Sequence, residues 1–200
     1  EDALELINPE FVPLQPLPDA QSALDGGAPL VHEHLGRNVA AFLHTKKGDG
    51  AAAMETAPHR LRRQFTHHRY AAMPLECRGV VADYDSRTDT LTIWSSTQVV
   101  HWVRREVATA LGMPEERVRC VAPDVGGGFG GKGHVYPEDI LIAYLARRLR
   151  RPVKWVEDRH EHILNAAHSR DNVYDVEIGF DDSGRILAVT SSFLVDSGAY

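Results

Sequence analysis

The alternation of apolar and polar residues predicts strands in the middle and toward the end of this chain. The stretches "GVVADYD" and "TLTIWSST" alternate on either side of the turn "SRTD", which predicts a β-hairpin over residues 79–95. A second hairpin is predicted where "VYDVEIGF" and "RILAVTSSFLV" flank "DDSG". The shorter runs "RQFTHHRYA", "RVRCVAP" and "PVKWVED" are predicted to be single strands.

Two segments instead carry apolar residues at helical spacing. The stretch "VVHWVRREVATALG" has them on one stripe, and Gly112 with Pro114 ends the helix. In "PEDILIAYLARRLR", Pro137 stands at the first helical position, with acids in the first turn and arginines at the end, as the helix dipole favours. The residues expected on the apolar stripes are Val99, Val103, Val107, Ala110 and Leu111 in the first helix, and Leu141, Tyr144, Leu145 and Leu149 in the second. Hairpins mixed with helices, without regular βαβ alternation, predict an α+β fold.

The first part of the chain has a different character. Its prolines within residues 1–30 exclude a long helix or a central strand, so we expect an extended arm with at most the short helix "DAQSAL". The segment "LHTKKGDGAAA" is interpreted as a strand end followed by an exposed turn. The chain has 200 residues, lacks an initiator Met and stops at "VDSGAY", from which we expect an excised part of a larger protein.

Composition and charge narrow the classes of function. With a net charge of -6, broad binding to nucleic acid or to an anionic membrane is not favoured. No apolar run approaches the roughly 18 residues of a membrane span, so none is expected. Cys77 and Cys120 form neither a disulfide framework nor a zinc motif, and we expect reduced, structural thiols in a cytoplasmic protein.

The histidines raise the question of a metal site. The triplet "HEH" occurs at residues 32–34 and again at 160–162. The two histidines of each triplet stand two positions apart and would leave a helix on different faces. His67 and His68 are consecutive, so they cannot face one metal from a strand. No metal-ligand set is therefore predicted, and structural or surface roles are expected.

The most unusual stretch is the glycine-rich "PDVGGGFGGKGHVYPED". Gly126, Gly128 and Gly131 satisfy G-x-G-x-x-G, and Lys132 completes most of a P-loop. Gly133, however, supplies no hydroxyl for magnesium, and no acidic residue follows at the ribose-binding distance of about 20 residues. A loop whose bare amides bind an anionic or oxo group is the preferred interpretation. A glycine-loop nucleotide-binding module is the alternative.

Six motifs in a fixed order carry a resemblance to a known family. The motif "STQ", with Gln98 at a helix entry, is followed by "PDVGGGFGGK", "YPED", "RPVKWVEDRHE", "HSRD" and "DSGAY". This order resembles the molybdenum hydroxylases, the family of xanthine dehydrogenase, aldehyde oxidase and the aerobic carbon monoxide dehydrogenase large subunit. The resemblance implies that residues 61–200 are the first part of the molybdopterin-binding domain. Residues 1–60 would be the extended connecting segment that follows the family's hammerhead domain.

The resemblance also implies a cofactor and a set of site residues. The cofactor would be molybdopterin with molybdenum, in the cytosine dinucleotide form usual in bacterial members, and this chain alone is not expected to bind it tightly. Gly128, Phe129 and Gly130 would lie nearest the metal, with Gly127 beside them in the cofactor-binding loop. Gln98 would hydrogen-bond an oxygen ligand of the metal. Phe129 would form one wall of the substrate pocket.

The implied activity belongs to a larger catalytic subunit. It is oxidation of a carbon centre in a small-molecule substrate with water as the oxygen source, and electrons leave through iron–sulfur and flavin subunits or domains. Gly133 stands where xanthine-oxidising members have an acidic residue, which argues against a purine substrate. The family's catalytic glutamate, and the copper-site cysteine of carbon monoxide dehydrogenases, would lie beyond Tyr200 in the remainder of the large subunit. A non-catalytic interface piece of a split homologue is the other alternative.

Overall fold

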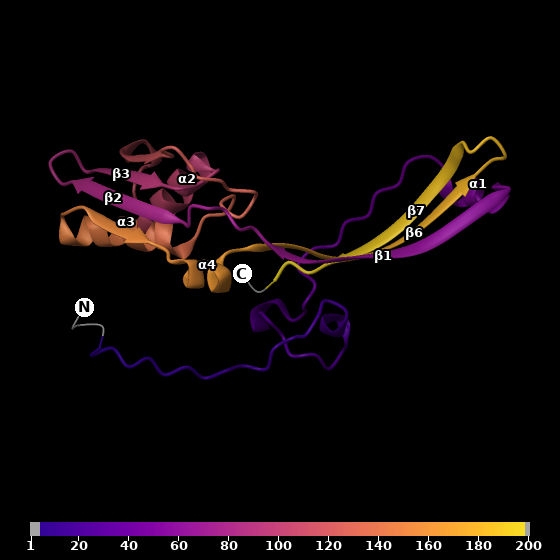
Figure 1. The fold of residues 1–200 in the computed structure, drawn as a ribbon, viewed down its shortest axis with the longest axis horizontal. Coiled ribbons are helices and arrows are strands. Elements are labelled where there is room, and N and C mark those ends of the chain that lie inside the picture. Colours follow the sequence, from indigo (N-terminus) through magenta and orange to yellow (C-terminus); the bar gives the residue numbers. More distant parts are fainter. Residues whose placement is uncertain (1–4, 199–200) are drawn as a thin grey trace. The chain divides into compact units, whose positions relative to one another are not determined.

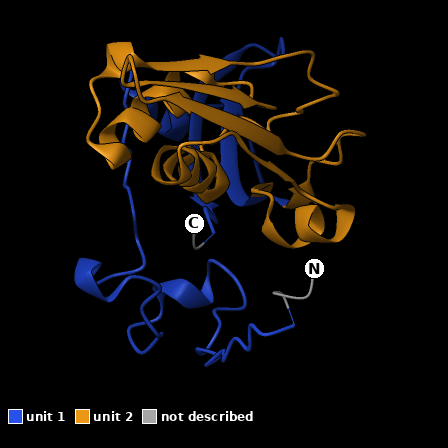
Figure 2. Ribbon diagram, turned by 90° about the vertical axis from the view of Figure 1, so that its left-hand side faces the viewer, with its two compact units in different colours: residues 1–67, 171–199 blue, residues 68–170, 200 orange. Residues whose placement is uncertain are grey.

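The computed structural model describes residues 5–198, and these divide into two compact units (Figure 2). The first unit combines residues 5–67 with residues 171–198, and the second is the continuous stretch 68–170. Both units contain helices and strands, as the predicted α+β class requires. No helix in the described part of the chain is long and apolar enough to cross a membrane.

The first unit is built on a three-stranded sheet in the order β1-β6-β7 (Figure 1). Strands β1 (His59–Ala71), β6 (His168–Phe180) and β7 (Ile186–Val195) match the strand and the second hairpin expected from the sequence. β6 and β7 pair antiparallel. Helix α1 (Gly50–Thr56) packs against β7, which supplies this small unit with a buried contact between helix and sheet.

The N-terminal part of this unit is mostly extended, with two departures from expectation. The predicted short helix is the 3-10 turn η1 (Ser22–Leu24), and the sequence did not indicate the second one, η2 (Glu33–Leu35). The strand end expected from Leu43 is wrong, because no strand pairing occurs there, and the exposed turn leads into α1. Asp49 starts this helix by accepting a hydrogen bond from the amide of Ala52 at 3.4 Å.

The second unit has a four-stranded sheet in the order β4-β3-β2-β5 (Figure 1). The strands all lie at predicted positions: β2 (Gly79–Asp85), β3 (Thr90–Ser95), β4 (Val118–Val121) and β5 (Val153–Val156). β2 pairs antiparallel with β3 and β5, whereas β3 and β4 run parallel. A parallel pair requires a crossover connection, and helix α2 (Val100–Leu111) provides it.

The other helices of this unit lie between its strands or after the last of them. η3 (Glu115–Arg117) precedes β4, α3 (Pro137–Leu149) comes after the glycine-rich segment, and α4 (Arg159–Asn165) comes after β5. The predicted start of α3 and the predicted end of α2 are confirmed, the latter at Gly112 in the left-handed conformation. The sequence did not indicate α4, which begins with a capping box at Asp158.

The buried face of each long helix differs in part from the predicted stripe. In α2, Val103 and Val107 are buried as expected, whereas Ala110 is exposed. The predicted stripe of α3 is wrong, because three of its members are between 41% and 55% exposed: Leu141, Tyr144 and Leu149. The buried residues of the α3 face that contacts the core are Ile142, Ala143 and Ala146. Small alanine side chains let the α3 backbone lie close to the sheet, so the larger apolar residues lie on the outer side of the helix.

Candidate functional site

The candidate site forms where two parallel strands end. β3 ends at Ser95 and leads into Gln98, while its parallel neighbour β4 ends at Val121 and leads into the glycine loop, residues 126–133. The carboxyl ends of parallel strands lie at the same edge of a sheet, which brings Gln98 to the loop although the two are far apart in sequence. The backbone amide of Gln98 donates to the carbonyl of Lys132 at 2.9 Å, which holds the end of the loop.

A single carboxylate holds both ends of the glycine loop. Glu76 accepts hydrogen bonds from the amide of Gly126 at 2.8 Å and from the ammonium of Lys132 at 2.6 Å. The hydroxyl of Ser96 donates to the same carboxylate at 2.7 Å. Burial opposes the charge, but these donors hold the pKa of Glu76 below its usual value, so the group is ionised at neutral pH. The Lys132 side chain is fully buried in this pair and is not available to a phosphate, as a P-loop lysine would be.

Gln98 lies against the centre of the loop. Its Oε1 accepts a hydrogen bond from the amide of Gly130 at 3.1 Å. A backbone N–H can only donate, so this contact determines which way the side-chain amide faces. The Nε2 hydrogens of Gln98 are left without an acceptor among residues 5–198. A Cβ on Gly128 would lie 2.4 Å from the same Oε1, so this contact requires glycine at that position.

The middle of the loop presents an aromatic ring and unpaired amides. Phe129 is 79% exposed and has a φ of 51°, a strained conformation for a residue with a Cβ. Its ring packs over Gly127, where an added Cβ would lie 2.8 Å from the ring. The amides of Gly128 and Phe129 have no acceptor in the described part of the chain. Together with the Nε2 group of Gln98, they form a set of neutral hydrogen-bond donors beside an exposed ring.

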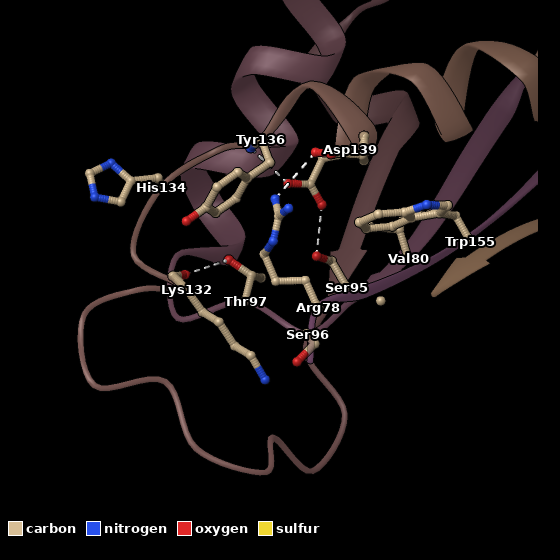
Figure 3. Close-up of a pocket in the computed structure, with 12 residues that line it drawn as sticks. Arg78, Val80, Ser95, Ser96, Thr97, Lys132, His134, Tyr136, Asp139 and Trp155 are labelled. Carbon is tan, nitrogen blue, oxygen red and sulfur yellow. Dashed lines mark hydrogen bonds and ion pairs between the residues drawn. The ribbon is translucent and has the colours of Figure 1, made fainter. Parts of the chain in front are cut away.

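Next to the loop lies a small pocket whose lining includes Arg78 and Tyr136 (Figure 3). The guanidinium of Arg78 stacks 3.6 Å from the centroid of the Tyr136 ring. It donates to Glu157 through Nε at 3.0 Å and through Nη2, and to Glu138 at 3.2 Å. The Tyr136 hydroxyl donates to the carbonyl of Gly131 in the loop. Arg78 therefore connects the loop to the edge of the sheet by way of Tyr136.

The first turn of α3 adds a second buried carboxylate. Asp139 accepts hydrogen bonds from the Ser95 hydroxyl at 2.8 Å and from the Tyr136 amide at 3.1 Å (Figure 3). Burial raises the pKa of Asp139, and these hydrogen bonds offset the effect only in part. Burial, with a further contribution from Asp139, raises the pKa of the Cys120 thiol to about 12. Cys77 and Cys120 are both free cysteines, as expected.

The structure brings the predicted site residues together in one place: Gln98, Gly127, Gly128, Phe129 and Gly130. No group of three metal-ligating side chains occurs among residues 5–198. Of the two histidine triplets, His32 and His34 are exposed, whereas His162 is buried. Sequence reasoning missed Glu76 and Arg78. Their signal is the pair of opposite charges in "ECRG", directly before an apolar strand.

These features define a class of site. Glycines that admit close approach, neutral N–H donors and a glutamine amide together form a backbone-lined site for an anionic or oxo group. The family model described as "Molybdopterin cofactor-binding domain" matches residues 31–200. The chain therefore belongs to the molybdopterin cofactor-binding domain family, which confirms the predicted family and the predicted fold class.

Two curated relatives and one solved structure illustrate the similarity. The nicotine 6-hydroxylase large subunit of Paenarthrobacter nicotinovorans is 37% identical over 200 residues, which cover 100% of this chain and 24% of that protein. The carbon monoxide dehydrogenase large chain of Afipia carboxidovorans is 32% identical over 212 residues, covering 100% and 26%. The crystal structure of quinoline 2-oxidoreductase from Pseudomonas putida 86 has a TM-score of 0.88 at 37% identity, covering 100% and 25%. The chain thus spans about a quarter of the length of these relatives.

Proposed function

We propose that this chain forms the loop side of a molybdenum-cofactor site in the large catalytic subunit of a hydroxylase or dehydrogenase. The observation that carries the proposal is the set of unpaired neutral donors on Gln98, Gly128 and Phe129. Membership of the family supports the cofactor. The names of the relatives, a hydroxylase, a dehydrogenase and an oxidoreductase, support the kind of activity.

The residues of the loop fit such a cofactor without acting as metal ligands. Preorganised N–H donors stabilise anionic oxygens, and a neutral glutamine amide does so without adding a charge of its own. An added Cβ on Gly130 would meet no atom of residues 5–198 within 4 Å, so this part of the chain leaves room for a bulky group at that point of the loop. When bound, the molybdenum group would supply the redox chemistry, while Gln98 and the loop amides would hold and orient it.

The proposed reaction is hydroxylation of a ring carbon in a planar, nitrogen-containing aromatic compound, with water as the oxygen source. A substrate C–H bond and one water give a C–OH group, two protons and two electrons. The relatives named for nicotine and quinoline support this substrate class, and the exposed Phe129 ring offers it a flat apolar face. The relative named for carbon monoxide makes that gas the competing substrate. Gly133, in place of an acidic residue, argues against a purine.

Several parts of the proposal concern the rest of the enzyme. Electrons would leave through iron–sulfur and flavin subunits or domains, and the remainder of the large subunit would supply the catalytic base. The pterin would carry cytosine dinucleotide. Residues 1–60 would connect from a hammerhead domain, and residues 61–200 would begin the molybdopterin-binding domain. The two free thiols, Cys77 and Cys120, support a cytoplasmic location.

The geometry does not favour the alternative of a nucleotide-binding module. The loop lysine, Lys132, is buried and paired with Glu76. Helix α3 begins only at Pro137, so its N-terminus does not follow directly on the last glycine of the loop, Gly133, as a phosphate-binding helix would. The other alternative, a non-catalytic interface piece, makes the opposite prediction in the following experiment.

The test uses the complete enzyme that contains this chain. Gln98→Ala should lower turnover by roughly 10²–10³, the cost of removing one preorganised donor, while the fold is retained. Gln64→Ala makes the same change at an exposed glutamine of β1 and should leave turnover unchanged. Molybdenum content and turnover are measured on both variants, and isotopically labelled water should place its oxygen in the product.

Two outcomes would contradict the proposal. If Gln98→Ala kept wild-type turnover at full molybdenum occupancy, Gln98 would not be part of the site. A wild-type protein that holds no molybdenum and oxidises neither nitrogen heteroaromatics nor carbon monoxide would support the non-catalytic alternative instead.

A further inference from the structure

The buried ring of His162 joins two parts of the second unit. His162 lies in α4 and is 1% exposed. Its Nδ1 is 2.8 Å from the carboxylate of Glu157, just after β5. Its Nε2 is 2.9 Å from the carbonyl oxygen of Ala72, just after β1. The ring therefore connects α4 to a segment that lies far away in sequence and next to the glycine loop.

Both ring nitrogens of His162 face atoms that accept hydrogen bonds. A carbonyl oxygen can only accept, so Nε2 must carry a hydrogen. The Glu157 carboxylate already accepts from the backbone amide and the guanidinium of Arg78, which hold its pKa below the usual value although burial opposes this. Glu157 is therefore ionised, and the His162 ring bridges this carboxylate and the Ala72 carbonyl.

The segment that contains Ala72 supports the glycine loop. Residues 72–78, here named the loop seat, run alongside the loop in the second unit. A Cβ on Gly131 would lie only 2.9 Å from the Cβ of Ala72. Glu76, further along the seat, binds both ends of the loop. The position of the seat therefore determines the position of the loop.

We propose that His162 is a positioning residue for the glycine loop: its buried ring holds the Ala72 carbonyl, and with it the loop seat, close to Glu157. The bond to Ala72 is the decisive one, because Arg78 already holds Glu157 from the other side. The consequence for the cofactor rests on the proposed function, whereas the consequence for the order of the loop does not.

Two neutral substitutions separate the roles of the two ring nitrogens. In His162→Gln the side-chain amide can still donate from the position of Nε2, toward Ala72. In His162→Asn it can donate only from the position of Nδ1, toward Glu157. Both introduce a neutral amide, so a difference between them reports on the bond to Ala72. Hydrogen–deuterium exchange of the complete enzyme measures the loop and the seat, with α2 as an internal reference.

We expect His162→Asn to speed exchange in residues 72–78 and 126–133 by roughly ten- to hundredfold, and His162→Gln to change it much less. Exchange in α2 should stay the same in both variants. Equal exchange in the two variants overturns the proposal, as does an acceleration of α2 that equals that of the loop.

Molybdenum content and turnover, measured on the same samples, separate this proposal from the proposed function. Faster loop exchange in His162→Asn with unchanged molybdenum and turnover would support the positioning role and refute the cofactor role of the loop. Loss of molybdenum with unchanged loop exchange would refute the positioning role.

Discussion

Replacing Glu76 by glutamine removes the negative charge that the buried Lys132 ammonium faces. The Glu76 side chain is 40% exposed, whereas the Lys132 side chain is 0% exposed. Removing one partner of a fully buried ion pair costs about 3–5 kcal/mol, because the other charge is left without compensation. Water reaches the Glu76 side of this pair and lowers the cost. We therefore expect Glu76→Gln to destabilise the second unit by about 2–3 kcal/mol.

The reverse substitution, Lys132→Met, should be milder. It leaves a carboxylate that water can reach and to which Ser96 and Gly126 still donate, so we expect a cost of roughly 1 kcal/mol. In the double variant the buried ammonium that penalises Glu76→Gln is absent. Its destabilisation should therefore be smaller than the sum of the two single effects.

Urea unfolding of the four proteins, followed by circular dichroism, gives these free energies and their coupling. The pH dependence supplies a second check. The pKa of Glu76 is lowered in the folded state, so its contribution is complete above the usual glutamate pKa and is lost as the pH falls through the lower folded-state value. Glu76→Gln should remove this acid-side loss. The reasoning is refuted if Lys132→Met destabilises at least as much as Glu76→Gln.

Two further predictions concern a loop glycine and the thiols. Gly128→Ala should push Gln98 aside and lower molybdenum content. Gly112→Ala, at the end of α2, brings its Cβ within 4 Å of no atom of residues 5–198; it should cost about 1–2 kcal/mol for its φ of 60° and leave molybdenum content unchanged. Molybdenum analysis with thermal unfolding distinguishes the two variants, and equal metal loss in both would contradict this. In the folded protein, Cys120 should react with iodoacetamide at pH 8 more slowly than Cys77, because its pKa is raised to about 12, and unfolding should make it reactive. Faster reaction at Cys120 than at Cys77 in the folded protein would contradict this.

Local signals made much of the second unit predictable. The hairpin of β2 and β3 follows from the alternation of apolar and polar residues on either side of a turn, and α3 follows from Pro137 at its first position and the two acidic residues after it. Gln98 and the loop were predicted as one site through motif order, and the parallel pairing of β3 with β4 is the physical reason that they meet.

The features that could not be predicted depend on contacts between distant segments. The core face of α3 is formed by Ala143 and Ala146, and no periodicity rule places alanines inside while leucines stay outside. Glu76 and Arg78 were not predicted as site residues, because their partners lie on the loop and after β5. Burial of His162 likewise follows from the tertiary fold, since its triplet is identical to the exposed one at residues 32–34.

The attachment of the glycine loop to the loop seat has a consequence for the order of folding. The loop is held by Glu76, which is 50 positions upstream of Gly126, and the seat is held in turn by His162, which is 90 positions beyond Ala72. Contacts of such long sequence separation carry a large cost of loop closure, so we expect them to form after the local hairpins and helices. We therefore expect the loop to take its native shape only when β5 has joined the sheet and α4 has packed beside it, so that the emerging polypeptide on the ribosome would have no finished site to load. A bulky metal group would enter a protein whose second unit is already closed, and loading would be a step of maturation after folding.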